Sequence, residues 1–167
     1  MIGNIKPIDE KSEAYGVLDL SKQRPEEWQR LDLSAVADSK DPDAKATEVS
    51  DVVYQSKKNA STISLNSACR QNAQYSDSLK GLRDLSNLLF FGISDIMQRD
   101  ENQLSIQGTP ALQTTVRGKI KSEDIMIRTV VLHRHSCIYD MVYLTPPDRF
   151  KNNETDFSQF VASLRLK

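Results

Sequence analysis

Residues 125–132 constrain the fold more than any other part of the sequence. In an extended chain, isoleucine, threonine and valine would line one side of this segment, and methionine, valine and leucine would line the other. Successive side chains of a strand point to opposite faces, so a strand that is apolar on both sides must be covered on both. We therefore predict that 125–132 is the central strand of a sheet.

Two further strands are predicted beside the central one in sequence, at 114–121 and 138–144. The segments 122–124 and 133–136 would be the turns between them. Short connections join neighbouring antiparallel strands, so the simplest topology for this part is an antiparallel meander.

Earlier in the chain, 51–54 and 61–65 are rich in β-branched residues and are separated by Lys57-Lys58-Asn59, which predicts a hairpin. Weaker strand patterns occupy 14–20 and 28–33, on either side of a segment that contains Pro25.

Two helices are predicted from apolar residues spaced three and four apart. The first spans roughly 77–98, where leucine and isoleucine recur over five turns, and the second spans 156–166. The elements follow in the order hairpin, helix, meander, helix. Single strands do not alternate with helices as in βαβ units, so we predict an α+β fold with an antiparallel sheet flanked by helices.

A chain of 167 residues is long enough for one domain and short for two. We expect a single domain at 14–167, preceded by a flexible tail at 1–13 that is charged and has few apolar residues. The segment 34–47 is small, charged and interrupted by proline, which is typical of a loop.

Composition excludes several classes of function. A net charge of -1 gives no overall basic field, so we expect no nucleic acid as partner. The longest apolar run, 88–91, is far too short for a transmembrane segment. The first residues lack a secretory signal pattern, which by itself does not decide between a cytosolic protein and a processed one.

No catalytic or cofactor motif is present. Gly-x-Ser-x-Gly does not occur, both histidines stand beside basic residues, and the glycines are too isolated for a phosphate-binding loop. We therefore expect that the protein is not an enzyme and uses no cofactor.

His133, His135 and Cys137 form the sharpest chemical pattern. At spacings of two residues they would project to one face of an extended strand, and imidazole and thiolate groups suit zinc or copper. The pattern straddles a predicted turn and has no evident fourth ligand, so a metal site is retained only as an alternative.

Aromatic side chains provide the candidates for recognition. Tyr139 and Tyr143 alternate on a predicted strand, which favours a role in the core. Trp28 lies beside a segment predicted to be mobile and is the one interface candidate.

The segment 126–166 resembles the C-terminal half of PsbP-like domains, which are α/β/α sandwiches. The resemblance is carried by two strands, Tyr-Leu-Thr-Pro-Pro and the helix Asp-Phe-Ser-Gln-Phe-Val-Ala-Ser-Leu. Leu65-Asn66-Ser67-Ala68-Cys69, the leucine-rich helix and Cys137-Ile138-Tyr139-Asp140 are also similar to a group of uncharacterised bacterial envelope lipoproteins. No cysteine for lipid attachment lies near Met1, which departs from that group unless the sequence begins after processing.

Cys69 and Cys137 are the two cysteines, so one intrachain disulfide is available. The envelope resemblance and the position of both cysteines at strand ends favour the bond, which persists in an oxidising compartment. The alternative is two buried free thiols in the cytoplasm.

The resemblance implies a non-enzymatic binding or assembly module, located in the periplasm or at the outer membrane. Its partner would be a protein, a lipid or a small ligand. Two alternatives stay open: a metal-binding protein that uses His133, His135 and Cys137, and a cytosolic adaptor that docks on a macromolecule.

Overall fold

The computed structural model describes residues 12, 14–32, 50–70 and 78–166 of the chain. In chain order the elements are β1 (Tyr15–Gly16), α1 (Leu20–Gln23), β2 (Trp28–Arg30), β3 (Val52–Ser56), β4 (Thr62–Cys69), α4 (Leu79–Leu89), β5 (Ser94–Ile106), β6 (Thr109–Ile120), β7 (Glu123–Arg134), β8 (Cys137–Thr145), the 3-10 helix η1 (Pro147–Arg149), α5 (Phe150–Ala162) and β9 (Arg165–Leu166).

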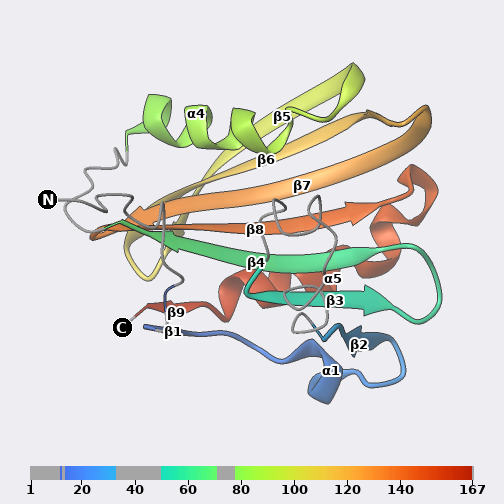
Figure 1. Cartoon of the computed structure of the whole chain (residues 1–167), viewed down its shortest axis with the longest axis horizontal. Coiled ribbons are helices and arrows are strands. Elements are labelled where there is room, and N and C mark those ends of the chain that lie inside the picture. The colour runs from blue at the N-terminus through green and yellow to red at the C-terminus, as the bar shows by residue number, and fades with distance from the viewer. Residues whose placement is uncertain (1–11, 13, 33–49, 71–77, 167) are drawn as a thin grey trace, which may run out of the picture.

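A seven-stranded antiparallel sheet, ordered β2-β3-β4-β8-β7-β6-β5, forms the middle of the molecule, and β1 pairs with β9 in a separate ribbon (Figure 1). Helix α4 packs through Leu82 on Val131 of the sheet, whereas the core that contains Phe157 of α5 includes Val130 and Leu132. Adjacent residues of a strand face opposite sides, so α4 and α5 cover opposite faces. The predicted α+β class, an antiparallel sheet flanked by helices, is confirmed.

Strand β7 is the central strand of the predicted meander. It pairs with β6 on one side and β8 on the other, and both of its faces are buried as predicted. The turn between β6 and β7 lies one residue earlier than predicted and is shorter. Lys121 and Ser122, both with positive φ, connect β6 to β7, and Glu123 already belongs to the strand. Non-glycine residues rarely adopt positive φ, so their identities gave no signal for this turn.

The predicted helix at 77–98 is too long by about two turns at its C-terminal end. Helix α4 ends at Leu89, and residues 94–106 form strand β5 instead. Ser78 caps the start of the helix, where its side chain accepts a hydrogen bond from the Gly81 amide. The regular apolar spacing continues past Leu89 by coincidence, because the apolar residues at 93 and 96 belong to the connection and to β5.

Helix α5 begins six residues earlier than predicted and ends at Ala162 rather than at 166. It continues directly from η1, which starts after Pro146, so no side-chain cap marks its beginning. Four predicted apolar positions are buried, and they anchor α5 on the sheet: Phe157, Phe160, Val161 and Leu164.

The hairpin predicted at 51–54 and 61–65 is β3–β4. The strands predicted at 14–20 and 28–33 are shorter, since β1 covers two residues, α1 intervenes and β2 ends at Arg30. The predicted loop at 34–47 lies outside the described residues, as does the predicted tail at 1–13 except for Ser12. Ser12 is buried and its amide donates a hydrogen bond to Ser67 Oγ at 2.8 Å, so the chain is fixed at that point.

Candidate functional site

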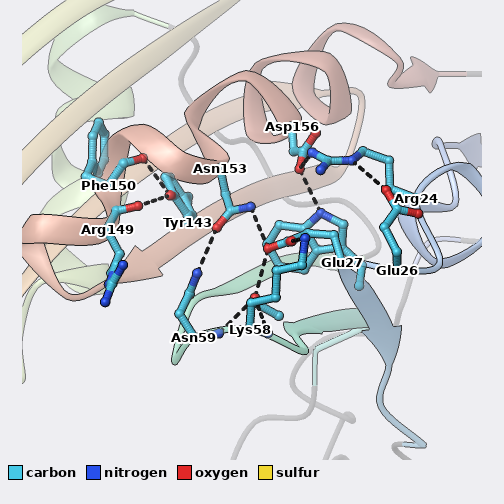
Figure 2. Close-up of polar contacts among 12 residues, drawn as sticks. Arg24, Glu26, Glu27, Lys58, Asn59, Tyr143, Arg149, Phe150, Asn153 and Asp156 are labelled. Atoms are coloured by element: carbon cyan, nitrogen blue, oxygen red, sulfur yellow. Dashed lines mark hydrogen bonds and ion pairs between the residues drawn. The ribbon is translucent and has the colours of Figure 1, made fainter.

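Trp28 is part of the core, so its prediction as an interface residue is wrong. Its side chain is 1% exposed, and the indole Nε1 donates a hydrogen bond to Asp156 Oδ2 at 2.9 Å. The same carboxylate oxygen accepts a hydrogen bond from Arg24 at 2.6 Å. These contacts attach the start of β2 and the segment before it to helix α5, and Trp28 and Asp156 are 128 positions apart in the sequence. Figure 2 shows the contact between Arg24 and Asp156.

A second buried carboxylate, Glu27, lies in the same region (Figure 2). Glu27 is 4% exposed, and its Oε1 accepts hydrogen bonds from the Asn153 amide and the Ser56 hydroxyl, both at 2.9 Å. The ammonium of Lys58 lies 3.2 Å from Oε2. Burial raises the pKa of Glu27, but the hydrogen bonds and the nearby ammonium outweigh it, so the pKa lies below its ordinary value.

The two buried carboxylates therefore hold the fold together. Their oxygens are occupied by donors from three separate segments. Glu27, whose pKa is lowered, is also poorly suited to proton transfer near neutral pH. We call Glu27, Asn153, Asp156 and Trp28 the α5 polar cluster. The hydrogen bonds of this cluster hold the N-terminal segment against α5.

His133, His135 and Cys137 do not share one strand. His133 lies in β7, His135 has a φ of 57° in the turn, and Cys137 begins β8. The argument that alternation places all three on one face is therefore wrong, because the chain reverses between them. Within the described part of the chain, no three His, Cys, Asp or Glu side chains are grouped so that they could hold a metal ion.

Cys69 and Cys137 form the predicted disulfide between β4 and β8. They are register partners, so the bond crosses directly between neighbouring strands. The bond occupies the sulfur that the metal alternative needed as a thiolate. Structural disulfides persist where the environment is not reducing, so the pairing indicates a non-reducing compartment.

The largest exposed apolar side chains of the described residues gather around the end of α4 and the start of β5. Phe91 is 92% exposed, Leu88 71%, Met97 67% and Ile96 47%. We call these four residues the α4–β5 apolar surface. Figure 1 shows that the end of α4 and the start of β5 lie at one end of the molecule.

A close backbone contact holds this surface in place. Gly118 of β6 faces the connection so closely that a Cβ there would lie 2.6 Å from Ile93 Cγ2 and 2.9 Å from the Ser94 carbonyl oxygen. Phe90 is buried beside Ile93, and the guanidinium of Arg99 lies 5.4 Å from its ring centre. Phe91 is thus exposed on a connection that is itself firmly packed.

A cavity of about 220 Å³ adjoins the same surface, between α4 and the sheet. Leu85, Leu88 and Leu89 of the helix line one side, and Ile138 and Asp140 of β8 contribute to the other. Ligand sites for drug-sized molecules usually measure about 300–1,000 Å³. This cavity has the size to accept a single apolar side chain.

No helix in the described residues combines the length and the apolar character that a bilayer crossing requires. No protein-family model matches the chain, and no curated protein matches it.

Solved structures do resemble the fold. The solution structure of cyanobacterial PsbP (CyanoP) from Synechocystis sp. PCC 6803 matches with a TM-score of 0.54, over 100% of this chain and 98% of that one, at 11% identity. A protein of unknown function, PA94 from Pseudomonas aeruginosa, matches with a TM-score of 0.48, 17% identity, and coverage of 85% of this chain and 84% of its own. The likeness to CyanoP shows a PsbP-like fold.

Reasoning from the sequence did not identify the α4–β5 apolar surface. Its spacing placed Ile93 and Ile96 on the buried stripe of a long helix, whereas the chain leaves the helix before reaching them. The available signal was the run 88–91, since four consecutive apolar residues at the end of a helix cannot all face the sheet.

Proposed function

We propose that the protein is a non-enzymatic binding or assembly module that docks a protein partner on the α4–β5 apolar surface. The observation that carries the proposal is the exposure of Leu88, Phe91 and Met97 at the end of α4, on the packed connection and at the start of β5. Because the fold already orders the backbone beneath these apolar side chains, a partner that covers them pays no backbone ordering cost on this side, and their burial favours binding.

A protein is the partner that the chemistry favours. Aromatic and methionine side chains are enriched at protein interfaces, and Leu88 of the surface also lines a small cavity, as in an anchor-and-pocket arrangement. Charged groups such as Arg99 and Asp95 lie close in sequence and would form the polar rim. The cavity beside Leu88 would receive one apolar side chain of the partner.

The hydrogen bonding of the buried carboxylates supports a role without catalysis. Glu27 and Asp156, the buried carboxylates of the α5 polar cluster, bind donors of the protein itself. Neither is directed at the cavity beside α4, whose described lining contains a single carboxylate, Asp140. A general acid and base pair would require two suitable groups within reach of a substrate.

The bacterial envelope is the compartment that we propose. The Cys69–Cys137 disulfide supports a non-reducing compartment, and the resemblance to envelope lipoproteins supports the periplasm or the outer membrane. A cytosolic adaptor remains the alternative that reduced cysteines in the source cell would favour.

The test compares partner retention by three forms of the full chain purified from source cells. The wild type is expected to retain one protein in near-stoichiometric amount, and the double variant Phe91→Ser/Met97→Ser is expected to lose it. Leu31→Ser is the matched control, because Leu31 is also an exposed apolar residue, 37% exposed, but follows β2 at the opposite edge of the sheet.

Binding must then be reproduced with the two purified proteins. Equal retention by all three forms would overturn the proposed surface. Flotation of the wild type, but not of Phe91→Ser/Met97→Ser, with phospholipid vesicles in the absence of any protein partner would show a lipid-binding surface instead.

A further inference from the structure

Strand β5 is the long free edge of the sheet. It has 13 residues and, among the described elements, pairs with β6 alone. The opposite edge strand, β2, has only three residues. A long edge strand presents unpaired amide and carbonyl groups that can pair with another strand, so proteins usually shorten, cover or charge such edges.

The hairpin turn determines which residues present those groups. Gln107 and Gly108 connect β5 to β6, and both have positive φ, at 51° and 78°. In a two-residue turn of this kind the flanking pair, Ile106 and Thr109, exchanges hydrogen bonds. The register is unbroken from Ile106 back to Gln98. Even-numbered residues of β5 therefore bond to β6, and odd-numbered ones direct their backbone groups to the free edge.

This parity limits how a second copy of the strand can pair. If two copies of β5 pair antiparallel through their free edges, each odd-numbered residue of one copy must lie opposite an odd-numbered residue of the other, because opposite residues exchange their backbone hydrogen bonds. A two-fold axis must then pass through a residue of β5 rather than between two residues. Three of the possible central positions lie on the charged run of β5: Arg99, Asp100 and Glu101.

Side-chain charge separates the three registers. An axis through Arg99 places two guanidinium groups opposite each other, and an axis through Glu101 does the same with two carboxylates. An axis through Asp100 places Arg99 of each copy opposite Glu101 of the other, in hydrogen-bonded pairs, and Gln98 opposite Asn102. Opposite charges across strands stabilise a pair, whereas like charges destabilise it.

The structure already orders these side chains. Arg83 of α4 binds Glu101 through two guanidinium nitrogens at 3.0–3.1 Å, and Arg99 donates to Asn87 Oδ1 at 2.7 Å. Both residues thus lie on the α4 side of the sheet. Asp100 lies on the other side, where the Gln98 amide donates to it at 2.8 Å. The facing Asp100 pair is the one like-charge contact in this register.

We propose that β5 is a self-association edge, to which a second copy of this chain adds its own β5 antiparallel, with the two-fold axis through Asp100. Of the three registers centred on the run Arg99-Asp100-Glu101, this one alone places opposite charges across the two strands. The result is a symmetric dimer with one continuous sheet. This inference goes beyond the proposed function because it needs no other protein as partner, and it uses the backbone edge of β5, the strand that also carries Ile96 and Met97 of the α4–β5 apolar surface.

Cysteine cross-linking tests the register. The residue on the axis faces its own copy, and Cα atoms in a non-hydrogen-bonded antiparallel pair lie about 4.5 Å apart, within disulfide range. Asp100→Cys is therefore expected to form a disulfide-linked dimer under mild oxidation. Arg99→Cys and Glu101→Cys, each one residue away, are expected to cross-link several-fold less. Dominant cross-linking of either neighbour, or of none of the three, would overturn the proposal.

Charge variants supply a second test without cysteines. Arg99→Glu alone and Glu101→Arg alone place like charges opposite each other, so each is expected to sediment as a monomer. An equimolar mixture restores opposite charges in both pairs and is expected to form a heterodimer. Circular dichroism spectra like that of the wild type show that the variants fold. Monomeric wild type at millimolar concentration, or a mixture that stays monomeric, would contradict the proposed edge.

Discussion

Trp28 shows how much of this fold depends on single buried residues. Its ring fills the core, and its indole N–H satisfies a carboxylate that would otherwise be buried with fewer donors. A hydrogen bond to a charged group contributes about 1.5–3 kcal/mol, and removal of part of a packed ring adds a cavity.

We predict that Trp28→Phe lowers the free energy of unfolding by about 2–4 kcal/mol. Gln29→Ala, a change at the exposed neighbour, is the control and should stay within about 0.5 kcal/mol of the wild type. Urea denaturation followed by circular dichroism measures both. A Trp28→Phe protein as stable as the control would remove the structural role assigned to the indole.

Glu27 should make stability depend on pH. Its pKa is lower in the folded protein than in the unfolded chain, so the ionised form favours folding. That contribution is complete above the unfolded pKa of about 4.3 and is lost as the pH falls through the lower folded value. Glu27→Gln is therefore expected to cost about 1–3 kcal/mol at pH 7 and progressively less below about pH 4.3. Urea titrations from pH 7 to pH 3 test this, and a difference that does not change with pH would contradict it.

For single residues, the pairing of the two cysteines could be predicted from the sequence, whereas the burial of Trp28 could not. Cys69 and Cys137 could be paired because no other cysteine exists. The role of Trp28 could not be predicted, because its hydrogen-bond acceptor, Asp156, comes from a helix at the other end of the chain. Burial of a ring is set by such long-range packing and not by its neighbours in sequence.

At the scale of the elements, the connection between α4 and β5 decides which apolar residues reach the surface. Gly118 allows the connection to lie directly against β6. Without this close approach, Ile93 could not pack beside Phe90 in the core, and the position of Phe91 would change.

We predict that Gly118→Ala destabilises the protein by about 1–3 kcal/mol, because the new Cβ would meet the backbone oxygen of Ser94 as well as a side chain. Gly92→Ala is the matched control, since nothing lies within 4 Å of a Cβ at that position. Thermal unfolding of the two variants makes the comparison. Equal melting temperatures would show that the connection can move away from β6 without cost.

Element type was predictable where one pattern extended over a whole element. The two-sided apolar pattern of β7 and the stripe of α5 identified a central strand and a packed helix. The end of α4 was not predictable, because helical spacing continues into β5 by chance and no proline follows Leu89. The start of α5 was obscured for a related reason, since η1 leads into it without a capping side chain.

At the scale of the whole molecule, the disulfide connects strands that are distant in sequence. Cys69 and Cys137 are 68 positions apart, and closing a loop of that length in the unfolded chain corresponds to about 4 kcal/mol in the loop-entropy model. We predict that the double variant Cys69→Ala/Cys137→Ala loses about 2–4 kcal/mol of stability. Guanidinium denaturation measures the loss, and addition of a reductant should destabilise the wild type but leave the double variant unchanged.

The same bond gives a prediction about the native cell. Acid quenching, thiol alkylation and peptide mass spectrometry should find Cys69 and Cys137 joined if the protein is in the envelope, the compartment that we propose. Two alkylated free thiols would contradict that location and favour the cytosolic adaptor.

The central claim is that the α4–β5 apolar surface meets a protein partner in the cell, and photo-cross-linking tests it most directly. A photoreactive phenylalanine analogue replaces Phe91 in the full chain, and a second form carries it at Leu31 as the control. We expect one discrete cross-linked protein from position 91, the same protein that wild-type purification retains, and none from position 31. No discrete product from position 91, or the same product from both positions, would contradict it.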